Sequence, residues 1–363
     1  MDRGELIQKF AVEGNAASFC EYGNGHINRT YLAEIEQGGK REKFIFQKIN
    51  TDIFRNVDQL MENIMGVTSF LGRKIAEQGG DPNRETLQVI PTREGASYYR
   101  DEEGCYRMYR FITGAVSLDA VRKPGDFYES AAAFGNFQAL LADYPAETLH
   151  ETIPDFHNTA KRYAAFRQAV EEDVCGRVKL VGPEIEFLRK RERELSVLAD
   201  LLEAGELPLR VTHNDTKLNN IMIDAESGKG ICVIDLDTVM PGLSVYDFGD
   251  SIRFGANTAA EDETDLGKVS LDLELYGLYV KGYLEGCRGK LTEKEVALLP
   301  MGAKMMTMEC GMRFLTDYLS GDTYFRIHRE NHNLDRCRTQ FALAEDMERK
   351  WARMEELTAA VSG

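Results

Sequence analysis

Three polar side chains in the second half of the sequence have the types and the spacing that phosphoryl transfer requires. Asp215 lies five residues before Asn220, and Asp235 follows a short apolar run. One carboxylate can orient an attacking hydroxyl and accept its proton, while an amide oxygen and a second carboxylate can hold Mg²⁺ against the phosphates of a nucleotide. Because Mg²⁺ takes few protein ligands, Asn220 and Asp235 would suffice beside phosphates and water. We therefore expect Asp215 to act as the base.

The local sequence predicts a hairpin that brings two of these residues together. Residues 221–223 are apolar and indicate a short strand, residues 224–230 contain turn-forming types, and residues 231–234 indicate a second buried strand. Since Asn220 precedes the first strand and Asp235 follows the second, pairing of the two strands would place both side chains at the same end.

Two further polar residues extend this group. Lys217 lies two residues after Asp215 and is assigned with it to the catalytic set, and Asp237 is a candidate ligand for a second metal ion. Asp235 and Asp237 also form a D-x-D, with which glycosyltransferases hold a metal on a nucleotide-sugar, but that alternative leaves residues 213–220 unexplained. A non-catalytic kinase-like binding module is the other alternative, and the presence of all the reacting groups argues against it.

Three runs of the sequence carry a family resemblance. They are residues 213–220 (HNDTKLNN), 233–242 (VIDLDTVMPG) and 247–255 (DFGDSIRFG). Together they resemble the N-acetylhexosamine 1-kinases, within the aminoglycoside phosphotransferase-like group of protein-kinase-like enzymes, and the resemblance extends from about Tyr22 to about Leu343. It implies ATP- and Mg²⁺-dependent phosphorylation of the anomeric hydroxyl of N-acetylglucosamine or N-acetylgalactosamine to the α-sugar 1-phosphate. A related kinase acting on another sugar, on choline or on an aminoglycoside remains the alternative.

The resemblance also implies the fold class. It is an α+β, bilobal protein-kinase-like fold, with an antiparallel-sheet N-terminal lobe that carries one main helix and a mostly helical C-terminal lobe. The patterns agree, because β-rich runs and a helical spacing over residues 56–78 give way to repeated 3.6-residue periodicity after residue 112. This periodicity predicts long helices, among them residues 293–319 and 333–357. We place the N-terminal lobe at residues 1–112 and the C-terminal lobe at residues 113–363, with a cleft between them.

The N-terminal lobe offers candidates for nucleotide binding. Gly23 and Gly25 lie in the first expected hairpin, where glycine lets backbone amides approach phosphates closely. Lys48 ends the next expected strand, the position of the phosphate-binding lysine of kinases. Glu62, on the helix that follows, is the candidate to pair with Lys48.

Other residues of this lobe are assigned to the two ligands. His26 and Asn28 could add side-chain donors to the nucleotide or the sugar. Tyr109 and Phe111 lie on the last strand of the lobe. In the resembled fold that strand leads into the hinge whose backbone meets the adenine edge.

The sugar pocket is expected in the C-terminal lobe. By the resemblance it contains Asp215 together with Arg253, Phe254, Arg313 and Tyr324. Arg313 lies in an otherwise apolar helical segment, where a charged side chain is costly unless it is paired or functional. A salt bridge with a glutamate four residues earlier, at position 309, is the simpler explanation for that charge.

The Asp247–Phe248–Gly249 triplet matches the D-F-G of protein kinases in letters. We do not assign it to a metal, because Asp235 already occupies the strand end that follows the catalytic hairpin. We expect Asp247 to be structural and to accept hydrogen bonds from the catalytic loop.

Composition restricts the partners and the compartment. The 363 residues include 44 basic and 60 acidic side chains, for a net charge of −16, which argues against nucleic acid or an anionic membrane as a partner. No signal-peptide pattern or membrane-spanning run is evident. The seven cysteines are odd in number and lack a C-x-x-C pair, which favours a reducing cytoplasm. We expect a monomer or weak homodimer that binds a nucleotide and a small sugar.

Overall fold

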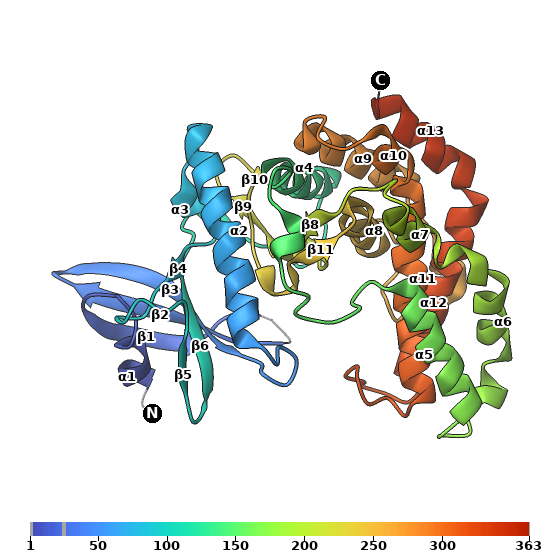
Figure 1. Cartoon of the computed structure of the whole chain (residues 1–363), viewed down its shortest axis with the longest axis horizontal. Coiled ribbons are helices and arrows are strands. Elements are labelled where there is room, and N and C mark those ends of the chain that lie inside the picture. The colour runs from blue at the N-terminus through green and yellow to red at the C-terminus, as the bar shows by residue number, and fades with distance from the viewer. Residues whose placement is uncertain (1–2, 24–26, 363) are drawn as a thin grey trace. The chain divides into compact units, whose positions relative to one another are not determined.

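The structure is a computed structural model that describes residues 3–23 and 27–362 (Figure 1). The chain divides into two compact units, which are described separately. Unit 1 consists of Met1–Ser117, Asp143–Pro154 and Ile221–Met240, and unit 2 of Leu118–Ala142, Asp155–Asn220 and Pro241–Gly363. The division is therefore discontinuous, whereas the sequence suggested a single boundary after residue 112.

Unit 1 is built on an antiparallel sheet with the strand order β1-β2-β3-β6-β4, in which β5 also pairs with β6. Its elements are α1 (Arg3–Ile7), β1 (Asn15–Glu21), β2 (Arg29–Gln37), β3 (Lys40–Ile49), α2 (Val57–Glu77), α3 (Pro82–Glu85), β4 (Val89–Ile90), β5 (Tyr99–Asp101), β6 (Gly104–Arg110), β7 (Ala115–Val116), η1 (Ala146–Thr148), β9 (Ile221–Asp224), β10 (Gly230–Val233) and η5 (Leu236–Thr238).

Side chains alternate between the two faces of this sheet. Phe46 on β3 and Met108 on β6 point to one face and join a hydrophobic core with α1. Gln47 and Arg107 point to the other face, where Arg107 approaches Met61 of α2. Figure 1 shows α2 alongside the sheet. A position on β3 therefore determines whether its side chain faces the core or α2.

Helix α2 illustrates how the sequence sets an element. The expected helix over residues 56–78 is observed as Val57–Glu77. Asn56 caps its N-terminus, because its side chain accepts a hydrogen bond from the backbone of Gln59 at 3.2 Å. The apolar positions Leu60, Ile64 and Leu71 are buried at helical spacing.

A small second sheet explains why residues 221–240 belong to unit 1. Strands β9 and β10 form the expected hairpin and pair antiparallel, and β9 also pairs with β7. Ile221 at the start of β9 is opposite Val233 at the end of β10. The residue before Ile221 and the residues after Val233 therefore leave this hairpin at the same end.

Unit 2 is mostly helical. Its elements are α4 (Pro124–Leu140), α5 (Thr159–Glu172), η2 (Val178–Leu180), α6 (Gly182–Lys190), η3 (Glu192–Glu194), α7 (Val197–Glu203), β8 (Arg210–Thr212), η4 (Leu218–Asn220), α8 (Ser244–Gly255), η6 (Leu266–Lys268), α9 (Leu273–Cys287), α10 (Glu293–Ala297), α11 (Leu299–Leu319), α12 (His332–Arg349) and α13 (Trp351–Ser362), and β11 (Met240–Gly242) begins at the last residue of unit 1.

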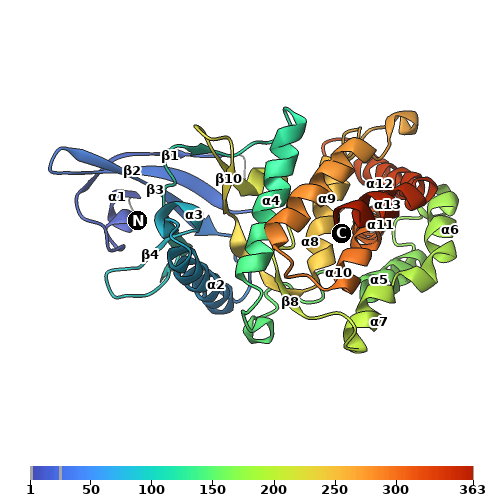
Figure 2. The ribbon, with the colours of Figure 1, turned by 90° about the horizontal axis from the view of Figure 1, so that it is seen from above.

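Glycines allow close packing in this unit. Helices α4 and α9 lie side by side (Figure 2), and a Cβ on Gly135 of α4 would lie 2.2 Å from the carbonyl oxygen of Tyr283 on α9. In the same way Gly249 of α8 faces Gly302 of α11, whose carbonyl oxygen would be 2.3 Å from an added Cβ. Asp247–Phe248–Gly249 is thus part of a packed helix.

The α+β fold class is confirmed, with an antiparallel sheet in the N-terminal region and helices in the C-terminal region. Some long helices that the periodicity predicted are divided. The expected helix over residues 293–319 breaks at Leu298, just before the proline at position 300, and the one over residues 333–357 breaks at Lys350. Among the described residues, no helix has both the length and the apolar composition needed to cross a membrane.

Candidate functional site

The loop of unit 2 that follows β8 and ends with η4, residues 213–220, holds Asp215. We call it the catalytic loop after its predicted role. The Nζ of Lys217 lies 2.8 Å from Oδ1 of Asp215. The side-chain amide of Asn220 donates to the backbone oxygen of Asp215 at 2.8 Å and to its Oδ2 at 3.2 Å. The Asp215 side chain nevertheless stays 25% exposed. It is therefore a fixed carboxylate that solvent, or a substrate, can still reach.

The same ion pair determines the charge of Lys217. Burial disfavours the charged ammonium, but the neighbouring Asp215 carboxylate outweighs this and raises the pKa of Lys217. Lys217 is thus a cation at neutral pH. The structure brings together the two residues that the sequence assigned to the catalytic set.

Asp247 of α8 holds the loop from beneath. Its two carboxylate oxygens accept the backbone N–H groups of His213 at 2.9 Å and Asn214 at 2.8 Å, and Gln138 adds a side-chain donor at 3.0 Å. Asn214 has a left-handed backbone with φ 65°, which this clamp supports. Burial raises the pKa of Asp247, against the opposing effect of these donors. The expected structural role of Asp247 is confirmed.

Asp250 forms a second clamp one turn later. Its Oδ2 accepts the backbone N–H of Thr216 at 3.1 Å, and its Oδ1 lies 3.0 Å from the guanidinium of Arg253. Arg253 also contacts Glu261 at 2.9 Å. Burial opposes ionisation, but Arg253 and Lys217 lower the pKa of Asp250.

These contacts correct the sugar-binding role expected for Arg253. Its side chain is 8% exposed, and its guanidinium is committed to Asp250 and Glu261. Arg253 therefore supports the catalytic loop. The following residue, Phe254, is 40% exposed and remains a candidate for substrate contact.

A second group of residues in unit 2 surrounds Arg313 of α11. Its guanidinium lies over the rings of Phe156, Tyr324 and Phe325 at 5.4, 5.9 and 5.5 Å. Arg313 and Tyr324, both expected in the sugar pocket, are thus brought together. They line a cavity of about 220 Å³ that also includes Arg162 of α5.

Two arginines, Arg162 and Arg313, and one aspartate, Asp317, are the charged residues that line this cavity. Burial and the nearby charge of Arg313 lower the pKa of Arg162, which shows that the two guanidinium groups are close enough to repel. Glu309 does not form the simple salt bridge with Arg313. Its carboxylate oxygens lie 2.8 Å from the ring of His157 and 2.8 Å from the hydroxyl of Thr159.

Asp235 lies in unit 1, immediately after β10. Its backbone is left-handed with φ 58°, an uncommon conformation for a residue other than glycine, and its side chain is exposed. Strain of this kind is often found where a side chain must be presented for function. The carboxylate is a suitable oxygen donor for Mg²⁺.

The second expected metal ligand, Asn220, lies in unit 2. Since Nδ2 of Asn220 donates to Asp215, the oxygen of the same amide points the opposite way and can act as an acceptor. Asn220 directly precedes Ile221, which is paired with Val233 two residues before Asp235. The two predicted ligands are one amide and one carboxylate, and both are donor types that suit a hard cation.

Asp237 differs from Asp235. It is buried, and its Oδ1 lies 2.6 Å from Nη1 of Arg107. Its Oδ2 accepts a hydrogen bond from the side chain of Asn28 at 2.6 Å. These partners correct two expectations, because Asp237 is neutralised by an arginine and is not available as a second metal ligand. The Asn28 amide is used within the protein, since it also accepts the backbone N–H of Asn50 at 2.9 Å.

Lys48 and Glu62 are also placed differently than expected. Lys48 shares the sheet face of Phe46, and its Nζ lies 5.7 Å from the ring centre of Tyr106. Glu62 on α2 instead contacts His150 at 2.7 Å. Adjacent residues on a strand point to opposite faces, so Gln47 occupies the α2 side and Lys48 does not. The expected Lys48–Glu62 pair is therefore wrong.

The remaining nucleotide candidates lie around the hairpin and β6. Tyr109 is buried, and β6 is paired on both sides at this position, with Ile45 and Val89. That makes Tyr109 part of the sheet interior. Phe111 follows β6, and its ring meets Tyr22 edge-on at 6.0 Å.

Gly23 has φ 75°, a backbone conformation that favours glycine, and an added Cβ would meet nothing within 4 Å. Gly25 and His26 lie outside the described residues. Gly23 and Phe111 thus remain candidates for nucleotide binding.

Sequence reasoning missed three residues of these clusters, namely Arg107, His157 and Arg162. Arg107 had a usable signal, because it stands within the apolar strand Tyr106–Met108–Tyr109 and a buried charge requires a partner. His157 and Arg162 had no distinguishing local pattern. Their significance comes from contacts with Glu309 and Arg313, about 150 residues away in the sequence.

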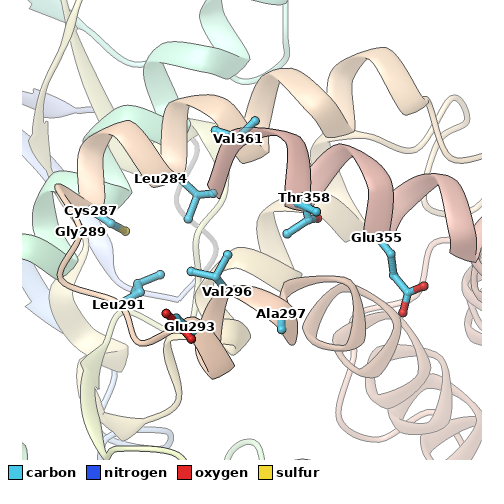
Figure 3. Close-up of a pocket in the computed structure, with 11 residues that line it drawn as sticks. Leu284, Cys287, Gly289, Leu291, Glu293, Val296, Ala297, Glu355, Thr358 and Val361 are labelled. Atoms are coloured by element: carbon cyan, nitrogen blue, oxygen red, sulfur yellow. The ribbon is translucent and has the colours of Figure 1, made fainter. Parts of the chain in front are cut away.

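A larger cavity in unit 2 is separate from these clusters (Figure 3). It measures about 680 Å³ and is lined mainly by apolar side chains of α9, α10 and α13, including Leu284, Val296 and Val361. Glu293 and Glu355 also line it. The catalytic loop and α11 contribute none of its lining residues, so it is not the candidate site.

Comparisons with known proteins place this geometry in a family. The fold is similar to that of an aminoglycoside phosphotransferase from Alicyclobacillus acidocaldarius, with a TM-score of 0.61, 11% identity and coverage of 99% of this chain and 97% of that one. A microcompartment-associated aminopropanol kinase is similar over 97% of both chains, with a TM-score of 0.58 and 16% identity. A spectinomycin phosphotransferase in complex with ADP and spectinomycin gives a TM-score of 0.52 at 13% identity, over 99% of this chain and 97% of that one.

These likenesses show a shared fold. The sequence itself gives the family, because residues 18–275, well over half of the chain, match the phosphotransferase enzyme family known as APH. The chain belongs to this family of phosphotransferases.

Proposed function

We propose that this phosphotransferase uses ATP to phosphorylate the anomeric hydroxyl of N-acetylglucosamine or N-acetylgalactosamine, giving the α-sugar 1-phosphate and ADP. The observation that carries the proposal is the catalytic loop. A partly exposed carboxylate, Asp215, is held by Lys217 on one oxygen and by Asn220 on the other. The sugar specificity rests additionally on the sequence runs that resemble N-acetylhexosamine 1-kinases.

The reaction requires a base that is oriented before the substrate arrives. Asp215 would accept the proton of the anomeric hydroxyl as that oxygen attacks the γ-phosphorus in line with the departing ADP. The two contacts to Asp215 restrict its rotation, and Asp247 fixes the backbone on which it stands. Because the transition state is loose, positioning and charge neutralisation should supply most of the rate.

Charge neutralisation is assigned to three groups. Asn220 and Asp235 would hold Mg²⁺, which when bound neutralises the phosphates of the nucleotide. Lys217 carries its positive charge next to the base and can attract a phosphate oxygen. Since Asp237 is neutralised by Arg107, the proposal requires a single protein-bound ion.

The acceptor class is argued from the charges around Arg313. Aminopropanol and spectinomycin, which the two structural relatives are named for, carry basic amines. Two guanidinium groups, Arg162 and Arg313, line the cavity of this chain and would disfavour a cationic acceptor. The one carboxylate of the lining, Asp317, already accepts three backbone N–H groups, from residues 323–325. Arginine donors suit hydroxyl and amide-carbonyl oxygens. A neutral N-acetylated sugar therefore fits the cavity better than an aminoalcohol.

The exposed aromatic rings favour the same class. Tyr324 is 66% exposed beside Arg313, and Phe254 at the end of α8 is 40% exposed. A ring of this kind can pack against the apolar face of a pyranose while the arginine meets its polar edge. This supports Phe254, Arg313 and Tyr324 as substrate-binding residues.

An acceptor panel tests the proposal directly. The purified protein, ATP and Mg²⁺ would be incubated separately with N-acetylglucosamine, N-acetylgalactosamine, glucose, glucosamine, choline, aminopropanol and an aminoglycoside, while ADP release is measured. We expect ADP only with the N-acetylated sugars, and ³¹P NMR should show an anomeric phosphate coupled to H1. Faster turnover of an amine would overturn the acceptor assignment, and ADP release from none of them would overturn the proposal.

A donor comparison addresses the D-x-D alternative. The same reactions would be repeated with UDP-sugars in place of ATP. Transfer from a nucleotide-sugar without ATP would support a glycosyltransferase, whereas the family assignment leads us to expect no product. Asp215→Asn provides the control for contaminating kinases, because it should remove the activity of this chain alone.

A further inference from the structure

A polar network in unit 1 links the start of β2 to the segment that carries Asp235. Arg107 is 1% exposed, and its guanidinium donates to Gln47 at 3.0 Å and contacts Asp237 at 2.6 Å. Gln47 in turn donates to the hydroxyl of Thr30 at 3.0 Å. On the other side Asp237 accepts from Asn28, which accepts from the backbone of Asn50.

This network acts on the backbone next to Asp235. The left-handed conformation at Asp235 is unfavourable for a side-chain-bearing residue, so the flanking structure has to impose it. Leu236 is buried at 1% exposure, and Asp237 is held through both carboxylate oxygens. The two residues after Asp235 are therefore fixed, and they constrain the backbone that carries its side chain.

We infer that Asn28, Asp237 and Arg107 form a positioning unit that orients Asp235 toward the metal-nucleotide. The unit also ties the backbone next to Asp235 to the start of β2. This inference rests on the proposed function and deepens it. None of the three side chains is assigned to touch the substrate. Arg107 neutralises the buried Asp237, and the contacts of Asp237 fix the backbone that follows Asp235. Asn28 links Asp237 to β2, the strand that follows Gly23.

The network also contains a cation, Arg107, on the sheet face that carries Gln47. A kinase-type lysine would have to stand on the face of β3 that carries Gln47, next to α2. In this chain that face carries the neutral Gln47, and the positive charge comes from Arg107 on the neighbouring strand. Because Arg107 is sealed by Met61, Tyr109 and Asp237, its charge acts through Asp237 and not by direct contact with phosphates.

Asn28→Ala is the decisive variant. It removes one hydrogen bond to a carboxylate yet leaves the Arg107–Asp237 ion pair intact, so no buried charge loses its partner. Hydrogen bonds to charged groups are strong enough that we expect the dissociation constant of Mn²⁺·ADP to rise about tenfold. Mn²⁺ serves as the probe because electron paramagnetic resonance reports bound Mn²⁺ directly.

Asn50→Ala is the matched control. It is the same substitution at a neighbouring amide, whose side chain contacts Ile27 and Asp52 but not Asp237. We expect this variant to bind Mn²⁺·ADP within about threefold of the unchanged protein, a difference too small to count as a lost charged hydrogen bond. Lys48→Gln, on the opposite sheet face, should behave like the control.

A double-mutant cycle separates positioning from a general structural effect. If Asn28 acts through Asp237, then Asn28→Ala should add little to the loss caused by Asp237→Asn, because both break the same link. Thermal unfolding of each variant would be followed in parallel. The expected signature of Asn28→Ala is weakened Mn²⁺·ADP binding and a raised KM for Mg·ATP with kcat little changed. The melting temperature should fall less than in Asp237→Asn, which also leaves Arg107 unpaired.

Several results would overturn the inference. They are unchanged Mn²⁺·ADP binding in Asn28→Ala, equal losses in Asn50→Ala or Lys48→Gln, and full additivity with Asp237→Asn. Asn28→Ser provides the same comparison should the alanine variant not fold, since serine is too short to reach Asp237. Failure of the unchanged protein to bind Mn²⁺·ADP would instead overturn the proposed function.

Discussion

The aspartates of unit 1 and unit 2 show a similar range of exposure but have different partners. Each presents one reachable carboxylate, Asp235 in unit 1 and Asp215 in unit 2. Each also buries aspartates nearby, Asp237 in unit 1 and Asp247 and Asp250 in unit 2. Both buried aspartates of unit 2 accept backbone N–H groups of the catalytic loop, and Asp250 is also paired with Arg253. Asp237 is instead held by side chains, those of Arg107 and Asn28.

This difference shows that burial and the type of donor determine which structural role an aspartate has. A buried carboxylate must be satisfied by donors or by a cation, and the groups that satisfy it are thereby fixed in place. Asp247 fixes a loop because its donors are main-chain amides, and Asp237 fixes a strand end because its donors are two side chains. The proposed function assigns substrate and metal to the more exposed aspartates, Asp215 and Asp235.

The sharpest test of this distinction is Asp215→Asn. If Asp215 is the base, we expect kcat to fall by about 10²–10⁴, because the amide cannot accept the proton. The fold should be unaffected, since Asp215 is partly exposed and its neighbours remain. Steady-state kinetics with N-acetylglucosamine, together with circular dichroism, would measure both quantities. Full activity in this variant would remove the base assignment and end the contrast with the buried aspartates.

Asp247→Ala tests the other side of the comparison. The change would leave two backbone N–H groups and the Gln138 amide without their acceptor inside the protein. We expect the free energy of unfolding to fall by about 3 kcal/mol, because buried unsatisfied donors are costly. Urea denaturation gives the measurement. A variant as stable as the unchanged protein but inactive would instead make Asp247 a direct participant in the chemistry.

Asp235→Asn tests the exposed carboxylate of unit 1. Asparagine tolerates the left-handed backbone at this position, so the geometry should be kept while the charge is lost. We expect the Mg²⁺ concentration for half-maximal activity to rise about tenfold, since an amide is a weaker ligand for a hard cation than a carboxylate. Asp237→Asn must not be used as its control, because it would also leave Arg107 unpaired. An unchanged Mg²⁺ requirement would contradict the metal role of Asp235.

Much of this arrangement could be predicted from local sequence. The strands around the catalytic loop and the helix capped by Asn56 follow from periodicity and turn chemistry over a few residues. Asp215 and Asn220 are close in sequence, so their spacing already indicates one site. By contrast, helix α8 was not anticipated, because its polar and glycine residues give no apolar periodicity and are buried only through tertiary contacts with helices such as α9 and α11.

The wrong predictions at the site concern residues whose role depends on contacts with residues far away in the sequence. Lys48 was chosen from its position on a strand, and a shift of one residue reverses the sheet face to which a side chain points. Asp237 stood next to a candidate metal ligand, and only its contact with Arg107, 130 residues earlier, shows that it is neutralised. Spacing in the sequence does not contain such pairings.

The smallest expected effect concerns a charged cluster outside the candidate site. Glu348 of α12 contacts Arg191 at 2.6 Å and Lys304 at 2.8 Å. Burial opposes its ionisation, but these two cations lower its pKa to about 2 from the ordinary value of 4.5. Because the folded pKa is depressed, the pair stabilises the fold above pH 4.5, and this contribution is lost as the pH falls toward 2.

Glu348→Gln should therefore lower the free energy of unfolding by about 1 kcal/mol at pH 7, the upper range for partly exposed ion pairs. Urea denaturation at pH 7 and pH 3 gives the measurement, and the difference between variant and unchanged protein should shrink at the lower pH. The kcat and the KM for N-acetylglucosamine should stay the same, since this carboxylate serves the fold alone. If Glu348→Gln lost activity at unchanged stability, burial and ion pairing would not distinguish structural from catalytic carboxylates in unit 2.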